Sequence, residues 1–277
     1  MRRISVVALL TLMGLFACSG AKVKVTGDPA GPSYQYEKAM NELLSGDYTQ
    51  AATMFEELSA STLNPVLSQM ATLRLGDAIF FQARYAEAAE VYRQFIEQYS
   101  RSPDWPHAAY MRGLCFLRKM PEDHWILPPA ERREMSDADN AYQSFVSLVQ
   151  GAPDSYYAMR ARLLLAKTVE RRCRHHLYVA AWYEKKDRPL GVTQRIEQAI
   201  ADETGEKARG RIPASFHCAD SPPTLLRLAR AYDAAKNPAG VQKSIARFNE
   251  RSSTMKVSSS ALKEIQALTI KYETTAK

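Results

Sequence analysis

The sequence predicts an all-α protein, a solenoid of about five helix pairs that follows an N-terminal lipid-anchored tether. Two observations predict the helix pairs. Apolar residues recur at i, i+3 and i+7, and this pattern returns at an offset of 37 residues. A third observation, an apolar run near the N-terminus that closes on a cysteine, predicts export from the cytoplasm.

An export signal is predicted in residues 1–17. Arg2 and Arg3 precede an apolar run that is too short to span a bilayer as a permanent helix and that ends just before Cys18. The run resembles the lipobox of bacterial lipoproteins, which implies cleavage before Cys18 and its acylation. By the same resemblance, Ser19 in place of Asp implies release to the outer membrane. The alternatives are an ordinary secreted protein or an incidental cysteine.

A flexible tether is predicted in residues 18–33, which are rich in Gly and Pro and lack an apolar period. The formal charge of +7 falls by two when residues 1–17 are removed. This mild basic balance is typical of charges scattered over solvated helix faces, and we expect no nucleic acid partner. After residue 18, no stretch approaches the roughly 20 apolar residues of a membrane helix.

Three helix pairs are predicted in residues 34–153, with first helices that align at the 37-residue offset. The aligned positions are Tyr36, Leu73 and Tyr110; Ala39, Gly76 and Gly113; and Leu43, Phe80 and Leu117. The second helices carry the triplets Ala51, Phe55 and Leu58; Ala88, Tyr92 and Phe95; and Ala141, Phe145 and Leu148. The last triplet is displaced by 53 residues, which indicates a 16-residue insertion within residues 119–139, where prolines preclude a continuous helix.

This arrangement resembles the tetratricopeptide repeat (TPR). A small residue on each first helix, such as Gly113, is expected to meet a small residue on the second, such as Ala141. Larger residues beside them fill the space between successive pairs, so nearly all of these positions serve packing. Stacked pairs create a concave groove that suits an extended peptide or a partner helix.

A fourth and a fifth TPR-like pair are predicted in residues 154–251. Ser155 is placed to cap a long first helix that continues through Tyr183, and Pro189 fits the first turn of its partner helix. The fifth pair begins at Pro222.

Two segments of the C-terminal part depart from the repeat pattern. Residues 201–221 carry Gly205, Gly210 and Pro213 and are expected to be irregular. Residues 252–277 open with a Ser-rich break and then carry apolar residues on one helical face, which predicts a C-terminal capping helix.

Several segments resemble the BamD family of outer-membrane β-barrel assembly lipoproteins. They are Tyr110-Met111-Arg112-Gly113-Leu114, the Pro-rich insertion after it, Pro153-Asp154-Ser155, Val179-Ala180-Ala181-Trp182-Tyr183 and Gly191-Val192-Thr193-Gln194-Arg195-Ile196-Glu197. The resemblance implies a non-enzymatic scaffold on the periplasmic face of the outer membrane, which helps a BamA-like barrel subunit to fold and insert β-barrel proteins.

By this resemblance, the first three repeats receive unfolded outer-membrane β-barrel precursors. Tyr110, Arg112 and Arg84 are the candidate groove residues. Tyr110 equally fits a packing role, because it occupies the repeat position that Leu73 fills in the preceding copy.

The resemblance also implies that the last two repeats dock the periplasmic domains of the barrel subunit. Arg195 matches the arginine with which the family contacts that subunit, and Tyr183 and Glu197 are candidate contacts from the same matching segments. A guanidinium can clamp a carboxylate with two hydrogen bonds, which a lysine cannot. The alternative is an exposed helix arginine that pairs near Glu197.

Three cysteines remain once Cys18 is acylated, in a compartment that is oxidising. Cys115 lies among packing residues and is expected to be a buried thiol. Cys173 and Cys218 fall in adjacent pairs and could form a disulfide, although sequence does not give their distance. A zinc site would have to use Cys173, His176, His217 and Cys218. This spacing fits no standard metal motif, so we expect no metal and no cofactor.

The sequence holds no Gly-rich phosphate loop, nucleophile elbow or zinc-protease helix, and we expect no enzyme. A tether and a groove also suit an alternative function. This alternative is a periplasmic TPR lipoprotein scaffold that coordinates peptidoglycan synthesis or envelope constriction.

Overall fold

The computed structural model describes residues 28–61, 64–120 and 135–274, which contain eleven α-helices and no strand. The chain divides into two compact units, Met1–Arg84 and Tyr85–Lys277. The prediction of an all-α TPR solenoid is confirmed. The expected boundary between repeats 1–3 and repeats 4–5, at residue 153, lies inside the second unit.

The first unit contains α1 (Pro32–Ser45), α2 (Tyr48–Ala60) and α3 (Pro65–Phe81). Gly46 ends α1 with a positive φ of 90°, and the Asp47 carboxylate then caps α2 by accepting a hydrogen bond from the Gln50 amide. Ala39 and Phe55 are fully buried, as the repeat pattern predicts. Helix α1 begins at Pro32, two residues before the predicted start of the first repeat at residue 34.

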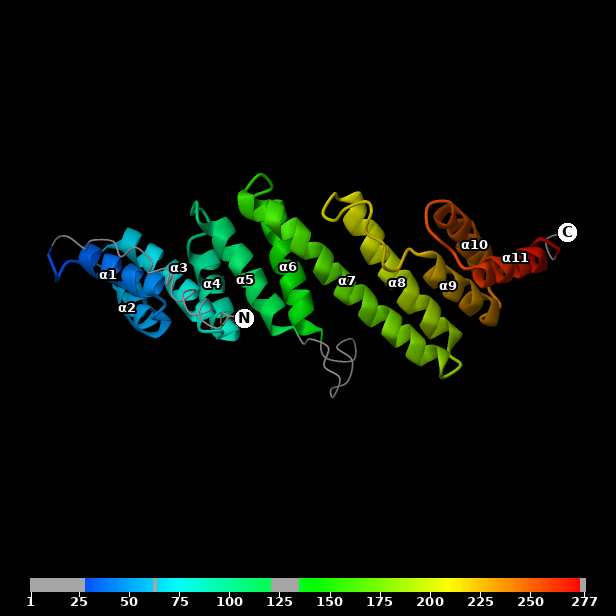
Figure 1. Ribbon diagram of the computed structural model, residues 1–277, viewed down its shortest axis with the longest axis horizontal. Coiled ribbons are helices and arrows are strands. Elements are labelled where there is room, and N and C mark those ends of the chain that lie inside the picture. Colours follow the sequence, from blue (N-terminus) through cyan, green and yellow to red (C-terminus); the bar gives the residue numbers. More distant parts are fainter. Residues whose placement is uncertain (1–27, 62–63, 121–134, 275–277) are drawn as a thin grey trace, which may run out of the picture. The chain divides into compact units, whose positions relative to one another are not determined.

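The described residues of the second unit form eight helices, and consecutive helices lie side by side (Figure 1). They are α4 (Tyr85–Gln98), α5 (Trp105–Lys119), α6 (Ser136–Gly151), α7 (Tyr156–Glu184), α8 (Pro189–Ala208), α9 (Pro222–Ala234), α10 (Pro238–Ser252) and α11 (Ser259–Thr274). The Ser155 hydroxyl caps α7 by accepting from the Ala158 amide, and Pro189 opens α8, both as predicted.

Glycine permits the close approach of α5 and α6. A Cβ atom at Gly113 would lie 2.4 Å from the Phe145 ring, far inside van der Waals contact. Phe145 is fully buried, and so is Ala141 one turn earlier. The close approach that was predicted at Gly113 is present, and the three atoms nearest to such a Cβ all belong to the Phe145 ring.

Helix ends bound the two predicted irregular segments. Helix α5 ends at Lys119 and α6 begins at Ser136, both inside the range 119–139 within which the 16-residue insertion was predicted, and residues 121–134 lie outside the described residues. Helix α8 continues to Ala208, so the first eight residues of the stretch 201–221 are helical.

The connector between α8 and α9 is fixed by a buried carboxylate. Glu203 is fully buried, and its Oε2 accepts hydrogen bonds from the amides of Cys218, Ala219 and Asp220, at 2.9, 2.7 and 3.3 Å. Lys207 balances the charge by donating to the other carboxylate oxygen at 2.7 Å. These hydrogen bonds hold the connector against α8, because a buried carboxylate must find donors.

A disulfide joins the same connector to α7. It links Cys173 and Cys218, whose Cα atoms are 6.4 Å apart. The bond takes both sulfurs of the zinc set that the sequence suggested, and the described residues hold no group of three or more possible metal ligands. Cys115 is a fully buried thiol outside the disulfide.

Candidate functional site

The turn from α7 to α8 is built by local contacts. The Arg188 amide donates to the Tyr183 carbonyl at 3.0 Å, and Asp187 adopts a positive φ of 51°. Gly191 lets the first turn of α8 approach the Tyr183 ring, because a Cβ there would lie 2.6 Å from that ring. These contacts fix the direction in which the first turn of α8 leaves the end of α7.

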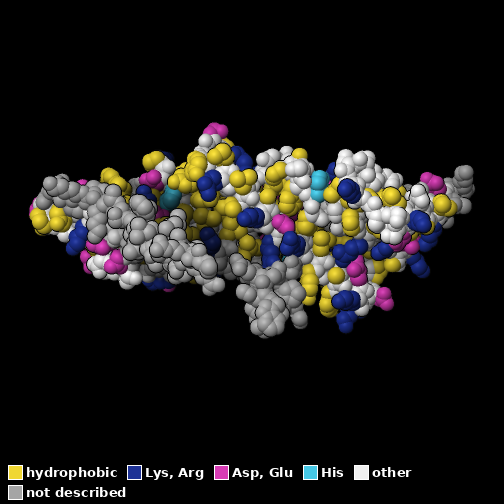
Figure 2. Space-filling view, in the orientation of Figure 1, with side chains coloured by type: hydrophobic (Ala, Val, Ile, Leu, Met, Phe, Trp, Pro, Cys, Tyr) yellow, Lys and Arg dark blue, Asp and Glu magenta, His cyan; other side chains and the backbone are white. Residues whose placement is uncertain are grey.

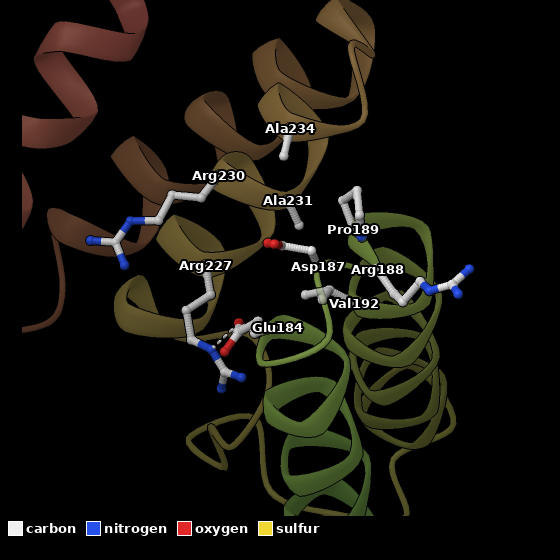
Figure 3. Close-up of a pocket in the computed structure, with 9 residues that line it drawn as sticks. All are labelled: Glu184, Asp187, Arg188, Pro189, Val192, Arg227, Arg230, Ala231 and Ala234. Atoms are coloured by element: carbon white, nitrogen blue, oxygen red, sulfur yellow. Dashed lines mark hydrogen bonds and ion pairs between the residues drawn. The ribbon is translucent and has the colours of Figure 1, made fainter.

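Two adjoining cavities flank this turn and share Arg188 and Pro189. The first, of about 330 Å³, lies between the turn and α9 (Figure 3). Its apolar lining residues are Pro189, Val192, Ala231 and Ala234. The second, of about 740 Å³, is lined mainly by Trp182, Tyr183, Lys186, Leu190, Gly191 and Gln194. We call the lining residues of both cavities the corner surface.

The charged residues of the first cavity differ in what they bind. Glu184 accepts a hydrogen bond from Arg227 at 2.9 Å, and Arg230 pairs with Glu264. Figure 3 shows the Asp187 carboxylate pointing between the turn and α9, while Arg188 and Arg230 point outward. Within the described part of the chain, Asp187 makes no side-chain hydrogen bond or ion pair, so it is available to a cationic group.

Large apolar side chains stand in solvent beside the second cavity. Trp182 is 51% exposed and Leu190 is 67% exposed, and the Trp182 ring meets the Tyr183 ring edge-on with centroids 5.1 Å apart. Figure 2 shows hydrophobic and Lys or Arg side chains mixed at this end of α7 and α8. Exposed aromatic residues beside a cavity and a basic rim are typical of protein interfaces.

Arg195 lies on α8, next in sequence to the lining residue Gln194, and is half-buried. Its guanidinium lies on the side of α8 that faces α7, because its positive charge contributes to lowering the pKa of His176 on α7. Burial is the main cause of that lowering, and the charge of Asp202 opposes it. The guanidinium forms no hydrogen bond or ion pair with the residues that the structure describes. Arg195 can therefore accept a carboxylate without first breaking an internal ion pair.

Glu197 and Tyr183 both make contacts within the protein. The Glu197 carboxylate accepts a hydrogen bond from the Tyr232 hydroxyl on α9 at 2.9 Å. Burial and this bond raise the pKa of Tyr232 to about 12. The three predicted contact residues thus face different neighbours: Arg195 faces α7, Glu197 faces α9, and Tyr183 covers Gly191.

The predicted groove residues fall into both units. Tyr110 is only 7% exposed, and its hydroxyl accepts a hydrogen bond from Arg160 at 3.3 Å, so it is largely a packing residue. Arg112 is half-buried over the Phe116 ring, and burial lowers its pKa. Arg84 ends the first unit, where it is exposed and donates to Gln82 at 3.1 Å.

Some residues of the corner surface were missed by sequence reasoning. Trp182 was noted only as part of a resembling segment, and Leu190 and Asp187 were not singled out. Pro189 predicted the turn itself, but the exposure of these side chains depends on which helices cover them. Cys18, the predicted lipidation site, lies outside the described residues.

Comparison with known proteins identifies relatives. Residues 30–209 match the family YfiO, described as "Outer membrane lipoprotein". The proteins named outer membrane protein assembly factor BamD from Pasteurella multocida and Haemophilus influenzae are 29% and 26% identical, over 68% and 71% of this chain and 72% and 75% of their own. The protein of the same name from Neisseria meningitidis serogroup B is 28% identical. That match covers 60% of this chain and 62% of the relative's length, so the chain spans less than two thirds of that relative.

Among solved structures, TPR-like repeats of a putative kinesin light chain from Podosopora anserina cover 84% of this chain and all of that chain. The identity is 13% and the TM-score is 0.38, which is too low to bear on the fold. None of the helices that the structure describes is long and apolar enough to cross a membrane.

Proposed function

Because this chain belongs to the YfiO family of outer membrane lipoproteins, we propose that it acts as a non-enzymatic assembly factor for outer membrane proteins. The names of its relatives support this proposal. In this role the protein scaffolds a β-barrel subunit and binds unfolded barrel precursors.

The proposed anchor is Cys18, acylated after removal of residues 1–17. Several acyl chains on one residue hold a protein to a bilayer stably, because each buried CH₂ contributes roughly 0.8 kcal/mol. The helical units then stand on the periplasmic face of the outer membrane. A Cys18→Ala variant is expected to leave the membrane fraction, and its continued retention there would contradict the lipid anchor.

The proposed docking site for the periplasmic domains of the barrel subunit is the corner surface together with Arg195. The observation that carries this proposal is the exposure of Trp182 and Leu190 beside two cavities. Exposed apolar side chains gain on burial, and the cavities offer places for partner side chains. Arg195 is proposed to clamp a carboxylate of the partner, and Asp187 to receive a cation.

The proposed precursor-binding residues lie in the first three repeats, Arg84 in the first unit and Tyr110 and Arg112 in the second. Arg112 is the best supported of them, since its guanidinium is half-buried and its Nε has no hydrogen-bond partner among the described residues. Arg84 is exposed and can contribute a charge, whereas Tyr110 contributes mainly the packing beneath. A precursor segment with an acidic or carbonyl group would satisfy Arg112.

Affinity purification of the tagged protein from its own cells tests the docking site. We compare the unsubstituted protein with Arg195→Ala and with Arg118→Ala, a matched variant of an exposed arginine on α5. Removal of one partner of a desolvated ion pair costs about 2–5 kcal/mol, so Arg195→Ala should reduce recovery of the barrel subunit at least tenfold.

Two outcomes would contradict the proposal. Equal recovery of the barrel subunit with all three proteins would remove Arg195 from the interface. Recovery of peptidoglycan-synthesis or division proteins in place of the barrel subunit would leave the fold standing and favour the alternative scaffold function.

A further inference from the structure

Charged side chains from three helices meet on α7. Arg172 reaches the carboxylates of Asp139 on α6 and Asp202 on α8, at 3.1 and 3.2 Å. The Nε2 atom of His176, one turn further along α7, lies 3.8 Å from the same oxygen of Asp202. The side chains of His176 and Asp202 are only 14% and 20% exposed, so these groups interact largely out of contact with water.

Arg195, the proposed docking arginine, belongs to the same group of charges. It precedes Asp202 by seven residues on α8, a spacing that places both on one face of the helix. Its positive charge acts on His176 across the contact between α7 and α8. We call Asp139, Arg172, His176, Arg195 and Asp202 the three-helix cluster.

The three-helix cluster is short of hydrogen bonds. Nδ1 of His176 and Oδ2 of Asp202 are buried atoms without a hydrogen-bond partner among the described residues. The other carboxylate oxygen of Asp202 accepts from Gln198 at 2.8 Å. Charges that are poorly solvated and poorly hydrogen-bonded respond strongly to any charge placed beside them. A change at Arg195 is therefore felt at His176.

The charges of the three-helix cluster cancel while His176 is neutral, because two carboxylates then face two guanidinium groups. The charged and titratable groups around His176 are Asp202 and Arg195 from α8, Arg172 and His175 from α7 and, through Arg172, Asp139 from α6. Burial lowers the pKa of His176, and the positive charge of Arg195 adds to this lowering, against the opposing effect of Asp202. His176 is thus neutral at pH 7 in the free protein.

We propose that docking at Arg195 is coupled to protonation of His176, so that the partner's carboxylate binds together with one proton from the solvent. This inference rests on the proposed docking site and states how that site is regulated. A carboxylate bound at Arg195 leaves the three-helix cluster with one excess negative charge, and a proton on His176 restores neutrality. His176 acts through the charge of Arg195 rather than by contact with the partner, so it is a positioning residue.

Docking should therefore tighten as the pH falls. The bound carboxylate offsets the charge of Arg195, so the pKa of His176 is higher in the complex than in the free protein. Between these two pKa values the complex holds a proton that the free protein lacks, and binding favours the protonated form. A difference of one unit gives up to about tenfold in affinity, so we expect binding to be roughly three- to tenfold tighter at pH 5.5 than at pH 8.

Binding of the detergent-extracted full-length protein to the purified periplasmic domains of the barrel subunit tests the coupling over this pH range. His176→Gln keeps a neutral polar side chain that cannot take up the proton, so its affinity should match that of the unsubstituted protein at pH 8 and should not rise in acid. His217→Gln is the control, because His217 is also half-buried but lies on the connector beside Lys207, at 3.1 Å. This variant should keep the tightening.

Calorimetry in buffers of different ionisation enthalpy counts the proton directly. The unsubstituted protein should take up as much as one proton per complex between pH 5.5 and 7, and His176→Gln should take up correspondingly less. Absence of proton uptake by the unsubstituted protein would overturn the coupling, whatever the variant does. Equal uptake by His176→Gln would also overturn it, because the proton would then bind elsewhere.

Arg195→Ala distinguishes failure of the coupling from failure of the docking site. If this variant binds as tightly as the unsubstituted protein at pH 8, the docking site is wrong and the coupling falls with it. If it binds more weakly but the unsubstituted protein and His176→Gln share one pH profile, the docking site stands and only the coupling is overturned. Circular dichroism at each pH confirms that the variants are folded.

Discussion

Opening the disulfide between Cys173 and Cys218 is expected to destabilise the second unit by up to about 4 kcal/mol. The bond closes a loop with a sequence separation of 45, which contains the end of α7, all of α8 and the connector to α9. Loop closure of this length removes about 13 cal/mol/K from the unfolded chain, which gives the stated free energy at 25 °C.

The folded state should survive this change. The Glu203 carboxylate still holds the connector through the amides of Cys218, Ala219 and Asp220, so the native contacts are largely kept. The loss then comes from greater freedom of the unfolded chain. For a unit of this size each kcal/mol shifts the melting temperature by about 2–4 °C, so the expected fall is about 8–16 °C.

Thermal unfolding followed by circular dichroism measures this shift. The oxidised protein is compared with the reduced protein and with a Cys173→Ala/Cys218→Ala double variant, and Cys115 is kept in all samples. Reductant should lower the melting temperature of the unsubstituted protein to near that of the variant and leave the variant unchanged. Equal melting temperatures before and after reduction, with the bond confirmed by non-reducing peptide mapping, would refute the reasoning.

Three further predictions follow from buried groups of the second unit. Gly113→Ala should lower the free energy of unfolding in urea by about 1–3 kcal/mol, because the new Cβ would meet the Phe145 ring at 2.4 Å. Unchanged stability would mean that the ring moves freely. Glu203→Ala should lower the free energy of unfolding by about 3–5 kcal/mol, measured by calorimetry, because it removes the acceptor of the half-buried Lys207 and of three backbone amides. A loss below about 1 kcal/mol would contradict this. Burial raises the pKa of Asp220, but the hydrogen bond from Arg251 and nearby cations outweigh it and hold the pKa below its ordinary value of 3.8. Its contribution is therefore present above about pH 4 and is lost as the pH falls through the folded-state pKa, so Asp220→Asn should flatten the decline of stability in acid. A decline of the same steepness in both proteins would show that Asp220 does not cause it.

Much of the fold was predictable from short-range sequence patterns. Caps such as Ser155 and helix-opening prolines such as Pro189 act within a few residues, so the sequence alone predicts the helix ends that they form. The repeat period was equally predictable, because buried positions such as Phe55 and Phe145 recur on one helical face. The family resemblance that the same sequence carries agrees with the match of residues 30–209.

The candidate site was only partly predictable. Glu203 resembles an ordinary surface carboxylate of a helix, and nothing in its spacing reveals that the connector folds back onto it. Arg195 and Glu197 are close in sequence, yet they face α7 and α9 respectively because successive helix residues point in different directions.

Periodicity and helix caps predicted the helices and their pairing, because these patterns depend on nearby residues alone. Which apolar residues stay exposed depends instead on how the helices pack in the folded protein. Leu163 and Leu165 differ by two positions on one helix, and one is 69% exposed while the other is fully buried. The difference arises because the two side chains point to nearly opposite sides of α7, and only the side that carries Leu165 packs against neighbouring helices.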